Sequence, residues 1–325
     1  GLPCEVSPND LYEKAFKMMI LNSDKPIVAT SANIDDIKKV HKIASIVAGG
    51  DQAFADKPFF VIYLEPVSPL KIEDDIAKRI MFCAQKGIPM LFAAGANLAV
   101  QAPGSPEDSI IQGTAESLSG LVLAYCVNKN AKFIFGANSA GFDSKKGIVS
   151  YGGPEWFKTM AYYSQIGMHL QFPTWGAAGC TDSTRIDAQT GFEAAMSTMM
   201  AELSGSTLVH DVGYLAHGDT TDPRAYILNA EIIRRARWYV NRGLVVPGVA
   251  KEIINDVAKG KIGTFLDSDH TLEKHGTRYH PPAWIDRETS DVDQPSLLEK
   301  LKQEDLKILH GTTPCTSAKI ESKRD

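Results

Sequence analysis

One segment of the chain, residues 172–183, combines several residue types that bind small molecules. It reads Phe-Pro-Thr-Trp-Gly-Ala-Ala-Gly-Cys-Thr-Asp-Ser, so aromatic rings and a carboxylate flank a run of small residues. Glycines let the backbone approach a ligand closely. Trp175 and Phe172 offer aromatic faces, and Asp182 offers a negative charge. Asp182 and Ser183 are equally suited to capping a following helix, and this alternative stays open beside the binding role.

A second segment, residues 209–218, contains His210, His217 and Tyr214, with an aspartate after the first histidine. This pattern raises the question of a metal, because zinc is bound by Cys, His and carboxylate ligands in tight local sets. No third ligand is clearly placed by the sequence, although His169 or Cys180 could complete a site in space. We therefore predict no metal and expect the histidines to form hydrogen bonds in a pocket or to be structural.

A third segment follows the run Lys132–Phe135 and extends to residue 155. We expect it to be a long loop, and long loops inside compact domains are often functional. Asn138, Asp143 and Tyr151 are its polar and aromatic candidates for contact with a substrate or partner. Pro154 suits the first turn of a helix.

Aromatic residues gather beside these three segments. A quaternary ammonium has no N–H group to donate, so proteins bind it with aromatic faces and a nearby carboxylate, each cationic contact contributing about 0.5 to 2 kcal/mol. We expect Trp175 to be the main binding ring, followed by Phe172 and Tyr214, while a plain core role stays open for half of the gathered rings. The gathered aromatics are Tyr151, Trp156, Tyr163, Phe172, Trp175 and Tyr214.

Other classes of function have little support. No GxSxG elbow, P-loop or Rossmann fingerprint is present, and Cys180 has no base assigned to it by pattern. The net charge of -5 does not suggest a nucleic-acid partner. The five cysteines show no CxxC pairing, which suits a reducing cytoplasm. Neither a signal peptide nor an apolar run of membrane length is apparent, so we expect a cytoplasmic protein with no membrane partner.

Six apolar runs of strand length must position these residues. Their spacing of roughly 30 to 45 residues is that of βα units, and continuous apolar strands indicate a parallel sheet covered on both faces. The predicted strands are 26–30, 59–64, 88–93, 132–135, 169–172 and 207–210.

The segments between the strands have helical periodicity. Asn33 caps a helix with an apolar stripe of Ile37, Val40, Ala44 and Val47 and a stop at 49–50. The corresponding stripes of later helices are Ile76, Ile80 and Cys83; Ile111, Ala115, Leu118, Val122 and Tyr125; and Phe192, Ala195, Met196, Met199, Met200 and Leu203. A further helix is predicted over 222–241.

A doubly wound sheet and a (β/α)₈ barrel both fit this alternation. We favour an α/β TIM barrel over residues 1–325 as a single domain, with a C-terminal helix and tail from about residue 288. A barrel has eight strands and the chain starts with Gly, so we expect one or two N-terminal strands to be missing and an edge to be exposed. The site of a barrel lies at the carboxyl ends of its strands, here near 30–31, Glu65, 94–95, 136–138, 174–180 and 210–217.

The combination of motifs resembles the trimethylamine methyltransferase superfamily from about Leu2 to Arg287. Members of that family are longer at the N-terminus. The residues that carry the resemblance are Gly176–Ser183, Asp187-Ala188-Gln189, Glu193, Gly141-Phe142-Asp143, Tyr151–Glu155, Phe265-Leu266 and His270-Thr271.

The resemblance implies a barrel that docks a separate corrinoid protein over its open end and transfers a methyl group from an amine to cob(I)alamin. The founding enzyme carries pyrrolysine, whereas this chain shows only standard residues and so resembles the branch that acts on betaines. Glycine betaine is the first expectation, with proline betaine, carnitine and γ-butyrobetaine next. Displacement at a cationic nitrogen needs no acid, which suits the sparse acid–base groups of the chain.

Two alternatives remain open at this point. One is a zinc-dependent methyltransferase barrel that uses His210, His217 and a cysteine. The other is a non-catalytic betaine-binding protein of the same fold.

Barrels of this type often associate, so a homo-oligomer is also expected. The predicted substrate site consists of eight of the residues already introduced, which are Trp175, Phe172, Tyr214, Tyr151, His210, His217, Asp182 and Asn138.

Overall fold

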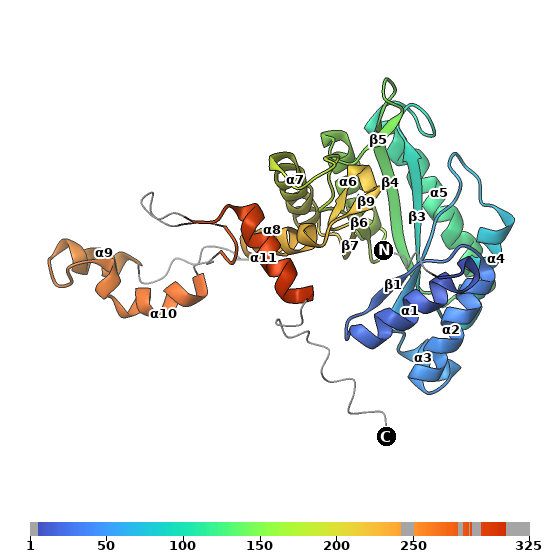
Figure 1. Cartoon of the computed structure of the whole chain (residues 1–325), viewed down its shortest axis with the longest axis horizontal. Coiled ribbons are helices and arrows are strands. Elements are labelled where there is room, and N and C mark those ends of the chain that lie inside the picture. Colours follow the sequence, from blue (N-terminus) through green and yellow to red (C-terminus); the bar gives the residue numbers. More distant parts are fainter. Residues whose placement is uncertain (1–5, 242–249, 279–281, 286, 288–293, 310–325) are drawn as a thin grey trace.

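A computed structural model describes residues 6–241, 250–278, 282–285, 287 and 294–309, and shows an α/β fold in which helices pack outside a curled sheet (Figure 1). The helices associated with the sheet are α1 (Leu11–Asn22), α2 (Ile34–Ala48), α3 (Asp51–Asp56), α4 (Asp74–Lys86), α5 (Pro106–Val127), α6 (Pro154–His169), α7 (Ala188–Ser204) and α8 (Pro223–Asn241). The predicted alternation of strands and helices is therefore confirmed.

Six parallel strands lie side by side in chain order. Strands β1 to β4 pair directly with one another, and a parallel bridge between Phe135 and Thr174 continues this order from β4 to the β6–β7 pair. Within the described residues no further strand pairs with β1 or β7 on its other side, so closure into a barrel stays a prediction. The six strands are β1 (Ile27–Ala29), β2 (Phe60–Leu64), β3 (Met90–Asn97), β4 (Phe133–Asp143), β6 (Trp175–Ala177) and β7 (Leu208–His210).

The outer face of this sheet is apolar and fully covered by helices. Phe92 and Phe135 are both 0% exposed within one continuous core. Gly120 of α5 lies directly over Phe92, because a Cβ at this glycine would come within 2.4 Å of the phenyl ring. Small residues on the helices thus make room for large rings on the strands, and the close packing holds the sheet in its curve.

Helix α2 matches its prediction closely. Asn33 accepts hydrogen bonds from two backbone N–H groups in a capping box, and Gly49 ends the helix in a left-handed conformation. Ile37, Val40 and Ala44 are all fully buried, whereas Val47 is exposed. Helix α4 is also as predicted, since Ile76, Ile80 and Cys83 are buried and Gly87 is the C-cap.

The predicted apolar stripe of α7 was wrong, and that of α5 was wrong in part, since only Leu118 and Tyr125 of it pack against the core. In α5, Ile111 and Val122 are exposed, while Ser117 and Gly120 face Phe92 of the sheet and Gly113 lies against Tyr163 of α6. In α7, the exposed side carries Phe192, Met196, Met200 and Leu203, while Glu193, Ala194, Ser197 and Ala201 are buried. Both helices approach their neighbours closely, and such contact selects small side chains rather than the largest apolar ones.

Helix α5 also corrects the expectation that no segment has membrane character. The helix has 22 residues, and an 18-residue window of it has a mean hydropathy of 1.3, so by length and composition alone it could span a membrane. It packs instead along β3 and β4 and between α4 and α6. One side of the helix therefore covers the sheet with its apolar residues.

The prediction for the fifth strand was also wrong. Residues 169–172 do not form a strand, because α6 continues to His169 and Gln171 then adopts a positive φ of 63°. The strand β6 begins three residues after the predicted segment, where Thr174 accepts a hydrogen bond from Leu208 of β7. Pairing with two neighbours, rather than local hydrophobicity, selects the segment that becomes the strand.

The segment after β4 was expected to be a loop but is largely a hairpin. Strand β4 continues to Asp143, pairing with β3 as far as Ala140, and then pairs antiparallel with β5 (Ile148–Ser150). A second short hairpin, β8 (Tyr214–Leu215) with β9 (Thr220–Thr221), follows β7. Both hairpins stand at the carboxyl ends of the parallel strands.

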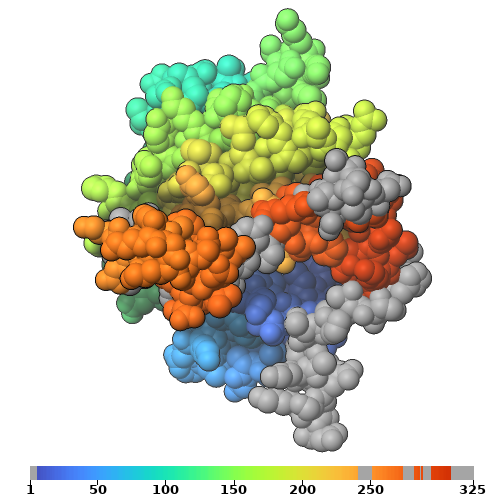
Figure 2. All heavy atoms as spheres, turned by 90° about the vertical axis from the view of Figure 1, so that its left-hand side faces the viewer, coloured from blue at the N-terminus to red at the C-terminus, as the bar shows by residue number. Residues whose placement is uncertain are grey.

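The C-terminal part adds α9 (Ala250–Ala258), α10 (Asp269–Arg278) and α11 (Leu297–Leu309). Leu301 of α11 is fully buried against Ile227 and Leu228 of α8. The division into a single barrel domain and a C-terminal helix and tail stays a prediction. Helices α9 and α10 project away from the sheet (Figure 1), and Figure 2 shows them in orange beside the red α11 on that face. The predicted tail over 310–325 lies outside the described residues.

Candidate functional site

The inner side of the curled sheet carries a group of aromatic rings at the carboxyl ends of three strands. Tyr63 of β2 stacks on His210 of β7, with ring centroids 5.8 Å apart and planes 15° apart. Trp175 of β6 lies 6.1 Å from Tyr63 and 6.2 Å from His210. Strands β3, β4 and β6 separate β2 from β7 in the sheet order, so this contact requires the sheet to curl strongly.

Acidic side chains lie beside these rings. Glu65, just beyond the end of β2, and Asp211, just beyond the end of β7, act on the same groups: both raise the pKa of Tyr63 and Tyr151 after the effect of burial. Together with Tyr214, whose ring centroid is 6.5 Å from that of His210, these residues form what we call the inner cluster. The inner cluster is Tyr63, Glu65, Tyr151, Trp175, His210, Asp211 and Tyr214.

A glycine on β3 makes room for Glu65. A Cβ at Gly95 would lie 2.6 Å from Glu65 Oε1, so a larger residue there would displace the carboxylate. Desolvation by the surrounding protein raises the pKa of Glu65, and Asp211 raises it further, although Tyr63 opposes this with a hydrogen bond. Burial makes the charged form of this carboxylate less stable. A cation bound beside it would stabilise the charged form and lower the pKa again.

His210 and Asp211 form a close pair within the inner cluster. His210 Nδ1 lies 2.6 Å from Asp211 Oδ1. Desolvation lowers the pKa of His210, but the adjacent Asp211 outweighs this effect and the net pKa is raised. The Nε2 atom of His210 makes no hydrogen bond to any described residue, so it is free to donate to a ligand.

The backbone that presents this pair adopts uncommon conformations. Asp211, Ala216 and His217 have positive φ angles of 67°, 50° and 48°. Such angles are infrequent for residues other than glycine, and they tend to cluster at functional sites. The positive φ angles therefore make the turn after β7 a candidate part of the functional site.

Tyr151 joins the inner cluster from the β4–β5 hairpin. Its ring centroid lies 5.0 Å from that of Trp156, and the Trp156 Nε1 group donates a 2.6 Å hydrogen bond to Asn138 Oδ1. Burial raises the pKa of Tyr151 to about 12, with Asp211 and Glu65 contributing. The structure thus brings Tyr151 and Asn138 to the same end of the sheet as Trp175, His210 and Tyr214.

Asp182 connects two segments rather than standing free. It accepts hydrogen bonds from Ser150 Oγ at 2.5 Å and from the Tyr151 backbone N–H at 2.8 Å. The Asp182 backbone N–H donates in turn to Glu193 of α7. Asp182 therefore positions Tyr151, and its contact with a substrate stays a prediction.

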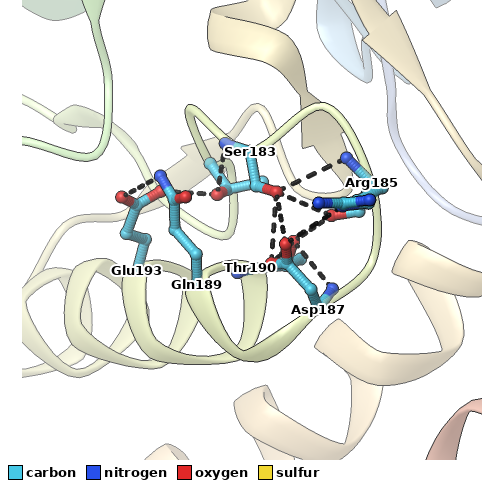
Figure 3. A network of polar contacts seen from close by, with 7 residues as sticks. Ser183, Arg185, Asp187, Gln189, Thr190 and Glu193 are labelled. Carbon is cyan, nitrogen blue, oxygen red and sulfur yellow. Dashed lines mark hydrogen bonds and ion pairs between the residues drawn. The ribbon is translucent and has the colours of Figure 1, made fainter.

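The residues after Asp182 form a capping network at the start of α7 (Figure 3). Asp187 is the N-cap, accepting from the Thr190 N–H, and Ser183 Oγ donates to Asp187. Arg185, with 83% of its side chain exposed, lies 3.6 Å from Asp187. Capping is thus provided by Asp187 with help from Ser183, and this network anchors the glycine-rich segment to the helix.

Phe172 lies apart from the inner cluster, whereas His217 lies at its edge, since a Cβ at the adjacent Gly218 would be 3.3 Å from the Tyr151 ring. Phe172 belongs to the outer core, where its ring packs edge-on against Phe133 at 6.0 Å. His217 lies in the turn between β8 and β9, with Nε2 3.8 Å from the exposed Asp219. The structure does not bring either side chain together with Trp175.

No nucleophile or metal site is evident in the described part of the chain. Cys180 is fully buried, and desolvation raises the pKa of its thiol well above the ordinary value. A buried thiol of this kind is unreactive. Among the described residues, no three His, Cys, Asp or Glu side chains form a group suited to a metal, and His210, His217 and Cys180 do not do so together.

Three members of the inner cluster were missed as site residues by sequence reasoning. Glu65 was recognised as a strand-end position but was not chosen, while Asp211 was considered only as a metal ligand. Tyr63 lies inside an apolar run and looks like a core residue. The available signal was the alternation of side chains along a strand. Tyr63 and Glu65 are two residues apart, so they point to the same face of the sheet, and together they indicate that this face is polar.

Comparisons with known proteins agree on one family. The family model described as trimethylamine methyltransferase (MTTB) matches residues 3–293. The chain is 28% identical to a glycine betaine methyltransferase of Desulfitobacterium hafniense (strain Y51) over 86% of this chain and 58% of that protein. It is 26% identical to the trimethylamine methyltransferase MttB of D. hafniense (strain DSM 10664 / DCB-2) over 96% of this chain and 63% of that protein.

A third relative is matched over a shorter part of the chain. The trimethylamine methyltransferase MttB of Methanosarcina thermophila is 29% identical over 64% of this chain and 45% of its own length. The chain therefore spans about half to two thirds of the length of these curated relatives. Among solved structures, the 7,8-dihydropteroate synthase from Vibrio fischeri ES114 aligns with a TM-score of 0.44 and 9% identity over 74% of this chain and 77% of that chain, a likeness too distant to carry an argument.

Proposed function

Since this chain belongs to the trimethylamine methyltransferase (MTTB) family, we propose that it is the main part of a corrinoid-dependent methyltransferase. The proposed substrate is a quaternary amine, with glycine betaine first, and the methyl acceptor is cob(I)alamin on a separate corrinoid protein. The observation that carries the proposal is the inner cluster, where Tyr63, Trp175 and His210 lie beside the carboxylates of Glu65 and Asp211. Its place in a curled, parallel sheet is the usual place of a barrel active site.

The cluster suits a methylated cation in two ways. Aromatic faces attract a cation that cannot donate a hydrogen bond, by about 0.5 to 2 kcal/mol each when water is excluded. Glu65, whose pKa is raised by desolvation, is stabilised in its charged form when such a cation binds beside it. Asp211 already has a partner in His210, which leaves Glu65 as the main counter-charge for the ammonium group.

The proposed reaction asks little proton chemistry of this chain. The C–N bond breaks with its electron pair remaining on nitrogen, which leaves as a neutral tertiary amine. The corrinoid, a second substrate, supplies the electron pair for the new bond to the methyl carbon. The inner cluster then has to bind the amine, hold one methyl group toward the incoming acceptor and limit access of water. No nucleophile from this chain is needed, which agrees with the raised pKa of the buried Cys180 thiol.

A substrate carboxylate would find hydrogen-bond donors in the same cluster. Trp175 is 2% exposed, yet its Nε1 group has no hydrogen-bond partner among the described residues. A buried donor without a partner calls for an explanation such as a ligand. His210, with its pKa raised by Asp211, offers a second donor at Nε2. These two groups favour a betaine over an amine that carries no acceptor.

The test is to mix the protein with a corrinoid protein reduced to cob(I)alamin and a panel of betaines and methylamines, and to follow the cob(I)alamin absorbance. We expect the signal to fall with one quaternary amine and the methylated corrinoid to appear. Trp175→Ala should lose most of this activity, whereas Phe192→Ala, a ring 63% exposed on α7, should keep it. Binding of an amine without methyl transfer to an active corrinoid protein would favour a binding protein instead.

A further inference from the structure

The rings of the inner cluster are held in two different ways. Tyr63, Trp175 and His210 lie on strands of the parallel sheet, whereas Tyr151 directly follows the short strand β5. Among the described residues, β5 pairs only with the end of β4, as the second strand of a hairpin. The position of the Tyr151 ring therefore depends on contacts that lie outside the parallel sheet.

One series of hydrogen bonds links Tyr151 to helix α7. The Asp182 carboxylate accepts from Ser150 Oγ at 2.5 Å and from the Tyr151 N–H at 2.8 Å. The Asp182 backbone N–H donates in turn to Glu193 Oε2 of α7 at 2.9 Å. Glu193 is only 8% exposed, so the hairpin is attached through Asp182 to a buried point of the fold.

Glu193 has further contacts on both sides of this series. Its carboxylate also accepts from the Thr181 hydroxyl and, at 2.9 Å, from Gln189 Nε2 (Figure 3). A Cβ at Gly152 would lie 2.4 Å from Glu193 Cδ, so the hairpin backbone packs directly on this carboxylate. Hydrogen bonds to an ionised acceptor are stronger than those between neutral groups. Glu193 is therefore suited to holding the end of the hairpin in one place.

The neighbouring Thr181 does not depend on Glu193 in the same way. The Thr181 N–H donates to the Tyr214 oxygen at 3.0 Å, and the Thr181 oxygen accepts from the His217 N–H at 3.1 Å. These backbone bonds would keep Thr181 and Tyr214 in place after a change at Glu193. The Asp182 N–H, in contrast, has Glu193 as its only partner among the described residues. Loss of the Glu193 carboxylate should thus act mainly on Asp182 and on the hairpin.

In the described part of the chain, the Glu193 carboxylate bonds to Thr181, Asp182 and Gln189, none of which belongs to the inner cluster. Resting on the proposed function, we infer that Glu193 is a positioning residue of the amine site, which acts through Asp182 to hold the Tyr151 ring beside the bound ammonium group. A ring attracts a cation only within about 6 Å of its centroid, so a small shift of the hairpin is enough to lose the contact. Because all quaternary amines share the ammonium group, Glu193 should affect the affinity for each of them by the same factor.

Isothermal titration of the wild type and of Glu193→Gln with tetramethylammonium and with glycine betaine tests this inference. Glutamine keeps the size of the side chain but removes the charged acceptor. We expect the Kd of both ligands to rise by the same factor, roughly fivefold to tenfold, as for residues coupled in one network. In a Tyr151→Ala protein, which already lacks the ring, Glu193→Gln should cause no further loss. A structural defect unrelated to Tyr151 would persist in this background.

The chain offers matched controls on the same helix. Glu202→Gln removes an equivalent charge from α7, where Glu202 pairs with Arg237 at 2.8 Å, and should bind both ligands as the wild type does. Gly152→Ala would displace the Glu193 carboxylate from the side of the hairpin and should reproduce the loss caused by Glu193→Gln. Gly191→Ala, where a Cβ meets nothing within 4 Å, should bind both ligands normally.

The other outcomes of these titrations decide against the inference or against its premise. Unchanged affinity in Glu193→Gln, or an equal further loss in the Tyr151→Ala background, would overturn the inference. A loss restricted to glycine betaine would do the same, because it would place the effect at the carboxylate of the ligand. If near-UV circular dichroism shows that Glu193→Gln does not fold, Gly152→Ala with and without Tyr151→Ala decides the question. Failure of the wild type to bind either ligand would instead remove the proposed function on which the inference rests.

Discussion

The two faces of the curled sheet are built from different kinds of residue. On the outer face, rings such as Phe92 and Phe135 are completely buried within a continuous hydrophobic core. On the inner face, Tyr63 and His210 interact with Glu65 and Asp211, and Trp175 Nε1 is buried without a hydrogen-bond partner among the described residues. The comparison indicates that the outer face supplies stability, whereas the inner face buries charged and polar groups at a cost in stability, as the proposed binding site would require.

The largest expected effect is on the outer face. Phe135→Ala should lower the free energy of unfolding by about 3 to 5 kcal/mol, because it removes a fully buried ring and leaves a cavity. Urea denaturation followed by circular dichroism measures this loss. Phe192→Ala, on an exposed ring, should cost within about 0.5 kcal/mol, and equal losses for the two variants would contradict the assignment of the core.

On the inner face, Glu65→Gln should weaken binding of a quaternary amine roughly tenfold, equivalent to about 1.4 kcal/mol. The substitution keeps the shape of the side chain but removes the counter-charge beside the rings. Isothermal titration with glycine betaine and with tetramethylammonium measures the change. Because the pKa of Glu65 is raised by desolvation, the unfolding free energy should not fall, and a large loss of stability would show that the carboxylate is structural.

Binding of a cation beside Glu65 on the inner face should depend on pH. A raised pKa means that Glu65 takes up a proton at a higher pH than an ordinary glutamate. Affinity for the cation should therefore be complete above this pKa and decline as the pH falls through it, with a midpoint above 4.5. Titrations across this range should show the decline in the wild type and a flat profile in Glu65→Gln. A midpoint below 4.5 would contradict the electrostatic description.

The smallest effect is expected in the network that anchors the glycine-rich segment. Asp187→Ala removes the N-cap of α7 and should cost about 1 kcal/mol of stability. Thermal unfolding measures this change. Asp187→Asn keeps a side-chain acceptor and serves as the control, so it should recover most of the loss. Amine affinity should remain at the wild-type level in both variants, and a selective loss of affinity would move this network from the fold to the binding site.

Local patterns were sufficient for much of the fold. The capped helix α2 and the strands β1 to β4 and β7 follow from apolar runs, Asn33 and Gly49, because these signals act between near neighbours along the chain. The pattern failed for α7 and in part for α5. Both helices have apolar residues on more than one side, so hydrophobicity could not say which side faces the sheet, and close contact selected Gly120 and Ala194 instead.

The candidate site divides in the same way. Trp175, His210, Tyr214, Tyr151 and Asn138 could be proposed from the sequence because they follow strands, and the carboxyl ends of parallel strands meet at one edge. Phe172 could not be excluded, because the true start of β6 depends on pairing with β7 and not on residues 169–172 themselves.

The sequence by itself determined the order of strands and helices, the caps of α2 and α4, and the edge of the sheet at which the inner cluster lies. Only the tertiary structure decided that Tyr63 stacks on His210 and that Glu65 and Asp211 share their surroundings. These contacts join strands that are more than 140 residues apart in the chain. They arise from the curl of the sheet, which results from the packing of all its helices together and is not encoded in any one segment.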